Sequence, residues 1–274
     1  MSQDEARKSA IAKAGRRLLP FLGLCYAVNF LDRVNVGFAA LSMNQDLGFS
    51  PSVFGAGAGI FFAGYILFEI PSNLAMQKFG ARIWIARIMI SWGVVAIAMA
   101  FVSGERSFYA LRFLLGVAEA GFFPGIILYL TYWFPARERA RIVSLFMAAV
   151  PLATMVGGPV SGALLEMHGL LGLKGWHWLF IVEGLPAVIF GLIALKFLDD
   201  RPEHARWLST DERMALASTL AAEAKATRET GYARLGEALT KPRVLVLGFL
   251  YFCIVIGFYG VSFWMPQVIQ TYGL

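Results

Sequence analysis

Long apolar stretches separated by short polar connections dominate the hydropathy pattern of this 274-residue chain. A helix needs about 20 mostly apolar residues to cross the hydrocarbon core of a bilayer. Seven stretches meet this requirement, and they predict transmembrane helices at residues 18–40, 53–76, 83–102, 108–134, 142–165, 178–198 and 244–266. The pattern therefore predicts an all-α membrane protein.

The lengths of the connections divide the chain into four parts. A polar N-terminus at 1–17 precedes six predicted helices, which short connections join into one bundle over 18–198. Residues 199–243 are polar and predict a cytoplasmic linker with a helical stretch at 209–226. The seventh helix, within 244–274, would begin a second bundle. This order is typical of the first half of a twelve-helix carrier, with the second half missing.

Composition and charge agree with this class. The chain is 58% hydrophobic and only 15% charged, whereas soluble domains are about 45–50% apolar and about 25% charged. Such a composition excludes a disordered chain. The two cysteines, Cys25 and Cys253, lie far apart without histidines at zinc-binding spacing, so we expect no metal site.

The distribution of Lys and Arg predicts the orientation in the membrane. Of the 24 basic residues, twenty lie on one side of the predicted membrane, in or beside the N-terminus, the linker and the second-to-third and fourth-to-fifth connections. Two lie in the loops on the opposite side, and Arg33 and Arg112 lie inside predicted spans. The positive-inside rule then places the N-terminus in the cytoplasm. This asymmetry explains the net charge of +6 without a nucleic-acid partner.

Ionisable side chains inside predicted spans are the candidates for function, because each costs roughly 2.5–3.5 kcal/mol at the centre of a membrane helix. Six are present, namely Asp32, Arg33, Glu69, Arg112, Glu119 and Glu183. Tyr26, Asn29 and Arg33 share one helix face, and Arg112 and Glu119 lie two turns apart on another helix. These carboxylates could simply neutralise the two arginines as structural ion pairs. A buried ion pair stabilises little compared with apolar packing, which favours a functional role.

Glycines at four-residue spacing predict close packing between helices. The spacing occurs in the pairs Gly55 and Gly59, Gly121 and Gly125, and Gly158 and Gly162. A dinucleotide-binding loop would require a preceding strand, which the pattern does not provide.

Four segments match known signatures. Residues 30–37 (FLDRVNVG) resemble the first-helix signature, and residues 112–125 (RFLLGVAEAGFFPG) the fourth-helix signature, of the anion:cation symporter family within the major facilitator superfamily. Residues 176–186 and 200–208 resemble its sixth helix and the start of its linker. The resemblance extends from about residue 16 to the end of the chain, and it is strongest to bacterial tartrate, phthalate and hydroxyphenylacetate permeases.

A cytoplasmic loop pattern of the superfamily, Gly-x-x-x-Asp-Arg/Lys-x-Gly-Arg-Lys/Arg, aligns with residues 73–82. Lys78, Gly80 and Arg82 match the pattern, and Gln77 stands in place of its aspartate. The resemblance implies a gating loop here, in which a latch through Gln77 would be hydrogen-bonded rather than ionic.

The resemblance also implies roles for the buried polar residues. It assigns binding of a substrate carboxylate to Arg33 and proton coupling to Asp32 and Glu119, while Arg112 would modulate Glu119 or attract the anion. In the seventh span, Tyr259 and Trp264 resemble positions of the family that face the cavity. Tyr26 and Asn29, on the same helix face as Arg33, complete the expected binding site.

We therefore expect a secondary active transporter that carries a small organic anion into the cell by alternating access. The anion would be a hydroxycarboxylate or dicarboxylate such as tartrate, or an aromatic carboxylate. An inside-negative potential opposes anion entry by about 2.3 kcal/mol per charge per 100 mV, so we expect protons as the coupling ion. No cofactor is expected, and the sequence offers no enzymatic motif.

The expected setting is a monomer in the bacterial inner membrane, whose partners are the anion, protons and lipid. An alternative stays open, in which a truncated half-carrier serves as a membrane sensor or binding protein, or is a non-functional fragment.

Overall fold

The computed structural model describes residues 2–229 and 240–272, and its long elements are all α-helices. They are α1 (Gln3–Leu47), α2 (Pro51–Phe79), α3 (Ala81–Ala98), α4 (Glu105–Glu119), α5 (Phe122–Thr131), α6 (Ala136–Met147), α7 (Ala149–Leu165), α8 (Gly175–Phe197), α9 (Thr210–Glu229) and α11 (Pro242–Thr271). Short 3-10 turns follow α3, α7 and α8, at Met99–Phe101, Leu170–Gly172 and Pro202–His204. The prediction of an all-α fold is confirmed.

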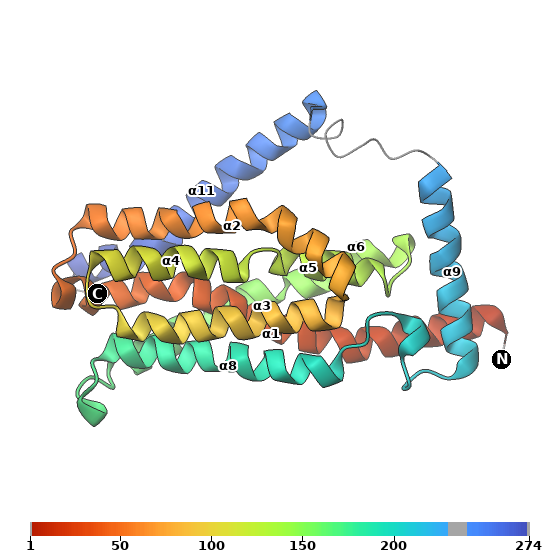
Figure 1. Ribbon diagram of the computed structural model, residues 1–274, viewed down its shortest axis with the longest axis horizontal. Helices are drawn as coiled ribbons and strands as arrows, with labels where there is room; N and C mark the ends of the chain where they lie inside the picture. The colour runs from red at the N-terminus through yellow and green to blue at the C-terminus, as the bar shows by residue number, and fades with distance from the viewer. Residues whose placement is uncertain (1, 230–239, 273–274) are drawn as a thin grey trace.

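The helices α1, α2, α3, α4 and α8 run side by side along the long axis of the molecule (Figure 1). The most extensive packing joins α3 to α8 and α2 to α4, while α1 packs on α8 and α7. At one end, α9 lies across the N-terminal part of α1, and α11 runs obliquely to the bundle and contacts α1 (Figure 1). The bundle therefore brings α1, α2, α4 and α11 together around the polar residues singled out above.

Six helical stretches of the described residues are long and apolar enough to cross a membrane, and they match six of the seven predicted spans. They are Pro51–Phe79, Ala81–Phe101, Glu105–Thr131, Ala136–Leu165, Gly175–Phe197 and Pro242–Thr271. The predicted span at 18–40 is not among them. It lies within α1, a continuous helix of 45 residues, where Asn29, Asp32 and Arg33 reduce the apolar character. The protein is thus a multi-pass membrane protein whose first bundle helix carries buried polar residues.

Two predicted spans contain breaks that the hydropathy pattern did not indicate. The span at 108–134 is divided into α4 and α5 at Gly121, whose φ of +84° lies in the left-handed region that favours glycine. The span at 142–165 is divided into α6 and α7 at Ala148. The first break follows Glu119 directly, so it places that carboxylate at a helix end inside the bundle.

Glycines allow α2 and α4 to pack backbone against backbone. A Cβ atom at Gly116 would collide with the backbone oxygen of Phe61, and one at Gly64 with that of Phe113. Of the predicted pairs, Gly121 and Gly125 abut Ser72 and Met76 of α2, as expected for close helix packing. The prediction is wrong for Gly59 and Gly162, where a Cβ would meet no atom of the described residues within 4 Å.

The linker contains a helix close to the predicted one, since α9 covers Thr210–Glu229 in place of 209–226. Residues 230–239 of the predicted linker lie outside the described residues. The first turn of α9 is bound to α1 through Glu212, whose carboxylate accepts hydrogen bonds from Ser9 (2.6 Å) and Lys13 (3.0 Å). Burial alone would raise the pKa of Glu212, but donation from Lys13, Ser9 and the Ser209 backbone outweighs burial and lowers it to about 2.

Candidate functional site

An ion pair between α1 and α4 forms the centre of the candidate site. Arg33 donates from Nε and Nη2 to the Oε2 atom of Glu119, over 3.2 and 3.0 Å. The Arg33 side chain is 12% exposed and that of Glu119 is 2% exposed. Asn29, one turn before Arg33, donates its amide to the other oxygen of Glu119. Two residues of the predicted shared face of α1, Asn29 and Arg33, therefore donate hydrogen bonds to one carboxylate of α4.

A third helix reaches the same guanidinium. Nη1 of Arg33 donates to the hydroxyl of Tyr259 on α11, over 2.9 Å. The Tyr259 ring packs against Phe62 of α2 and against Phe263, with centroid separations of 4.9 and 5.6 Å. Every nitrogen of the Arg33 fork thus has an acceptor, and these acceptors come from two other helices.

Aromatic rings of α2 line the cationic side of the site. The Phe61 ring centroid lies 5.6 Å from Cζ of Arg33 and 4.8 Å from Cζ of Arg112. The Tyr65 ring centroid lies 4.9 Å from Cζ of Arg33. Cations over aromatic faces are stabilised by the ring quadrupole, so two arginines can be held close to one another in the bundle.

Arg112 is fully buried, and its Nε donates to the backbone oxygen of Gly57 over 3.2 Å. Its Nη2 atom has no hydrogen-bond partner within the described residues. Arg112 and Glu119 form no ion pair within 4 Å in that part of the chain. The two side chains can therefore interact only through longer-range electrostatics.

Asp32 belongs to a different polar site from its neighbour Arg33. Its carboxylate accepts a hydrogen bond from the indole of Trp92 on α3 (2.8 Å) and lies 3.5 Å from the amide nitrogen of Asn35. Asp32 is 2% exposed, and no cation contacts it among the residues described. Adjacent residues of a helix point about 100° apart, which explains the separation. Asp32 therefore forms no ion pair with an arginine in the described structure, unlike the structural alternative considered from the sequence.

A further buried carboxyl group joins α7 to α8. Ser161 donates its hydroxyl to Oε1 of Glu183 over 2.7 Å, while Oε2 has no partner in the described parts of the chain. Asn35, which lies next to Asp32, also interacts with Glu183. The second polar site thus contains two carboxyl groups and no arginine in contact with them.

The remaining predicted binding residues lie at the edges of the site. Tyr26 stacks on Phe146, with ring centroids 4.6 Å apart, and also packs against Phe123 at 5.4 Å. Trp264 packs edge-on against Phe54 and lies 3.6 Å from where a Cβ of Gly55 would be. Neither side chain contacts Arg33 directly in the described structure.

The predicted gating loop connects α2 to α3, and it is tied to the chain that follows α8. Gly80 has a φ of +89°, and the backbone nitrogen of Arg82 donates to the Asp200 carboxylate over 2.8 Å. Gln77 and Lys78 are exposed, and within the described residues the Gln77 side chain makes no hydrogen bond. A link through Asp200 therefore takes the place of the expected latch through Gln77.

Several residues of these sites were not singled out from the sequence. Phe61, Tyr65 and Trp92 are aromatic residues in apolar spans, where nothing distinguishes them from ordinary core residues. Asp200 lay in a recognised motif, but the motif does not indicate which loop it contacts.

The fold and the buried polar sites together define the class, an all-α multi-pass membrane protein with charged groups inside its bundle. A sequence profile described as Major Facilitator Superfamily matches residues 22–274. The chain belongs to the Major Facilitator Superfamily, a family of transporters and not of enzymes.

Similar curated proteins carry the names of transporters. A protein of Agrobacterium vitis described as "Putative tartrate transporter" is 59% identical over 264 residues, which cover 96% of this chain and 61% of that protein. The "Inner membrane transport protein RhmT" of Escherichia coli is 45% identical over 263 residues, covering 96% of this chain and 61% of that protein. The chain thus spans about three fifths of the length of these relatives.

Solved structures confirm the fold. The xylose transporter XylE of E. coli, in a partially occluded inward open conformation, has a TM-score of 0.70 and 17% identity. The match covers 93% of this chain and 65% of that one. A bacterial homologue of the lysosomal transporter Spinster matches with a TM-score of 0.63 over 68% of this chain and 44% of that one, at 21% identity.

Proposed function

We propose that this chain works in a proton-coupled symporter that carries a small organic anion into a bacterial cell through the inner membrane. The observation that carries the proposal is the nearly buried guanidinium of Arg33, held between Glu119 and Tyr259. The names of the relatives favour a hydroxycarboxylate or dicarboxylate, such as tartrate, as the anion. Protons serve as the coupling ion, and the transporter acts as a monomer.

Arg33 binds the substrate carboxylate in this proposal. A guanidinium presents a planar fork of donors that matches a carboxylate geometrically. The donors of Arg33 already contact Glu119, so a substrate carboxylate competes with Glu119 for them. A proton on Glu119 removes this competition, because a neutral carboxyl group is a weaker acceptor for a cation. Proton binding and anion binding therefore favour each other, as linkage requires.

Asp32 carries the second proton. Its site is separate from that of Arg33, so the two carboxyl groups can be loaded independently. One monovalent anion that enters with two protons carries a net positive charge inward. An inside-negative membrane potential then drives the step by about 2.3 kcal/mol per charge per 100 mV.

Movement of the bundles follows from the contacts between helices. Arg33 and Tyr259 couple α1 to α11, and substrate binding at Arg33 would alter that contact. On the cytoplasmic side, the gating loop of Gln77, Lys78, Gly80 and Arg82 is joined to Asp200. Alternating access through rigid-body rocking requires contacts of this kind to break and form on opposite sides of the membrane. Arg112, Tyr26 and Asn29 shape the anion site around Arg33.

The proposal is tested with the polypeptide that the complete gene encodes, reconstituted in liposomes that contain a pH-sensitive dye. Tartrate, phthalate, hydroxyphenylacetate and sugar acids are added in turn, with a neutral sugar as the negative control. We expect one anion to acidify the interior. Glu119→Gln abolishes the acidification and permits anion exchange, whereas Glu105→Gln, at the exposed start of the same helix, has no effect. Unchanged uphill uptake by Glu119→Gln would refute the coupling role.

A further inference from the structure

Asp32 has no direct route to water among the described residues. Its side chain is buried, and the two groups that contact it are the indole of Trp92 and the amide of Asn35. An indole N–H only donates hydrogen bonds, and the side chain of asparagine does not titrate. A carboxyl group that takes up and releases a coupling proton therefore needs a titratable neighbour.

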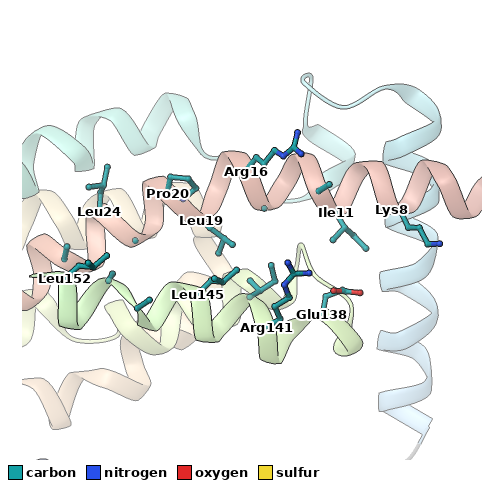
Figure 2. Close-up of a pocket in the computed structure, with 17 residues that line it drawn as sticks. Lys8, Ile11, Arg16, Leu19, Pro20, Leu24, Glu138, Arg141, Leu145 and Leu152 are labelled. Carbon is teal, nitrogen blue, oxygen red and sulfur yellow. The ribbon is translucent and has the colours of Figure 1, made fainter.

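The open groove beside α1 does not supply this route. It lies between α1 and the α6–α7 pair, has a volume of about 990 Å³, and has Leu24 and Leu152 at one end (Figure 2). Its lining on α1 ends at Ala27. Asp32 follows five residues later, about 7.5 Å further along the helix axis, so the groove ends short of the carboxylate.

Glu183 of α8 is the titratable group that shares the site of Asp32. The amide nitrogen of Asn35 lies 3.5 Å from Oδ1 of Asp32, and Asn35 also interacts with Glu183. Glu183 acts on Asp32 electrostatically more strongly than Glu119 does, and Glu119 is held by Arg33. Asp32 and Glu183 therefore lie against one amide, and no cation contacts either of them in the described structure.

The Glu183 side chain has an oxygen that is free to hold a proton. Ser161 of α7 donates to Oε1 over 2.7 Å, whereas Oε2 is buried and has no hydrogen-bond partner in the described parts of the chain. An ionised carboxylate carries charge on both oxygens, and an unpaired charge away from water costs far more than a neutral hydroxyl group. The geometry therefore favours a neutral acid at Glu183, with its proton on Oε2.

Helix packing alone does not explain an acid at this position. The hydrogen bond from Ser161 needs only an acceptor, which the amide oxygen of a glutamine would also provide. Helix α8 is in any case packed closely on α3 beside Glu183, where a Cβ at Gly184 would lie 3.1 Å from that of Ala96. Only the binding of a proton requires the carboxyl group.

We propose that Glu183 is a further proton-binding residue, which exchanges its proton with Asp32 across Asn35. The inference rests on the proposed coupling role of Asp32. In the exchange, the O–H bond of the Glu183 acid breaks and an O–H bond forms on the Asp32 carboxylate. Glu183 then carries the negative charge, and the net charge of the pair is unchanged. The two groups do not ionise together, because like charges in one buried site repel each other.

Infrared spectroscopy detects this proton directly, in the purified polypeptide that the complete gene encodes, in detergent at neutral pH. A protonated carboxyl group has a C=O stretching band distinct from that of a carboxylate, and the band shifts in D2O. We expect Glu183→Gln to remove one such band and Asp32→Asn to shift it, because the charge next to Glu183 is lost. Glu166→Gln, which removes an exposed acid at the end of α7, leaves the band unchanged.

Transport shows whether the proton is used. In the liposome assay, Glu183→Gln should slow anion-driven acidification at least about tenfold, because a positioned proton-transfer group ordinarily contributes orders of magnitude in rate. Anion exchange and anion affinity should stay as in the original protein. Glu183→Asp, which keeps the acid on a shorter side chain, should restore part of the rate, and Glu166→Gln should have no effect.

The two measurements separate failure of this inference from failure of the proposed function. If no anion acidifies liposomes that contain the original protein, the proposed function fails, while the infrared band still decides whether Glu183 holds a proton. If the original protein and Glu183→Gln acidify the liposomes at the same rate, Glu183 takes no part in coupling and only the inference fails.

Two infrared results would also overturn the inference. One is a difference spectrum between the original protein and Glu183→Gln without a band of a protonated carboxyl group. The other is a Glu183 band at the same position in Asp32→Asn, since the two groups would then be independent. Circular dichroism verifies that each variant is folded. Should Glu183→Gln not fold, Glu183→Asp should move the band, and an unmoved band would assign it to another residue.

Discussion

Trp92 of α3 donates a hydrogen bond to the Asp32 carboxylate over 2.8 Å, and both side chains are buried. The next residue along α1, Arg33, points to Glu119 and to α11 instead. One helical turn of α1 therefore serves two separate polar sites. The two carboxyl groups that we assign to proton coupling can be perturbed one at a time.

Replacement of Trp92 by phenylalanine tests the role of Asp32. Trp92→Phe keeps an aromatic ring but removes the donor, and a hydrogen bond to a charged group is worth about 1.5–3 kcal/mol. We expect anion-driven proton uptake in liposomes to fall about tenfold, as in Asp32→Asn, while anion exchange persists. Trp178→Phe, in the first turn of α8 and away from Asp32, is the control. Normal proton uptake in Trp92→Phe, with a loss in Asp32→Asn, would show that Trp92 does not support coupling.

The second prediction concerns the contribution of the Arg33 guanidinium to anion affinity. Arg33→Lys retains the charge, but an ammonium group lacks the planar fork of donors that matches a substrate carboxylate. We expect the affinity for the transported anion to fall about a hundredfold, measured by calorimetry. Tyr259→Phe leaves the fork intact and removes only its hydrogen bond to α11, so the affinity should change by about tenfold at most. Tyr251→Phe on the same helix, where the side chain is exposed, should cost nothing. If Arg33→Lys bound the anion as tightly as the original protein does, Arg33 would not be the residue that binds the anion.

The sequence predicts most of the bundle because membrane spans depend on the length and hydropathy of single segments. It predicts less of the site, because contacts depend on how helices rotate against one another. Arg112 and Glu119 share a helix face, yet two turns correspond to about 10 Å along the axis, too far for direct contact. Glu119 instead meets Arg33 of α1.

The partners of Asp32 and of the gating loop could not be predicted for the same reason. Trp92 lies in a helix whose apolar residues are spread over all faces, and periodicity gives no indication of which ring faces α1. Asp200 contacts Arg82 across 118 residues of sequence, a pairing that only the packing of α8 beside α3 brings about. Local signals therefore identified which residues are unusual, and tertiary packing determined their partners.

A third prediction concerns Gly80 in the gating loop. Gly80 has φ +89° and ψ 147°, and a Cβ there would lie 3.0 Å from Oδ1 of Asp200. Gly80→Ala should destabilise the protein by about 1–3 kcal/mol and loosen the contact with Asp200. Gly104→Ala is the matched control, since its backbone is extended and a Cβ has open space. Thermal unfolding in detergent gives both values, and equal melting temperatures would contradict the strain at Gly80.

The last prediction concerns the pH dependence of the contact between α9 and α1. Hydrogen bonds from Lys13, Ser9 and the Ser209 backbone outweigh the effect of burial and lower the pKa of Glu212 from 4.5 to about 2. An undocked carboxyl group takes up a proton near its ordinary pKa, whereas the docked one resists until much lower pH. Docking is therefore fully stabilised above about pH 4.5 and is weakened progressively as the pH falls towards 2. The loss is smaller than the about 3 kcal/mol that the full shift represents, because the Ser209 bond at the start of α9 remains when α9 undocks.

Distances between spin labels measure this docking directly. Labels replace Gln3 on α1 and Met214 on α9, both exposed, in a variant whose exposed Cys253 has been replaced. We expect a single short distance at neutral pH that broadens only below about pH 4.5. Glu212→Gln broadens the distribution at every pH, because the neutral amide loses the attraction to Lys13, whereas Glu203→Gln, an exposed residue of the same linker, does not. A distribution in Glu212→Gln as narrow as in the original protein would mean that α9 is held on α1 by apolar contacts alone.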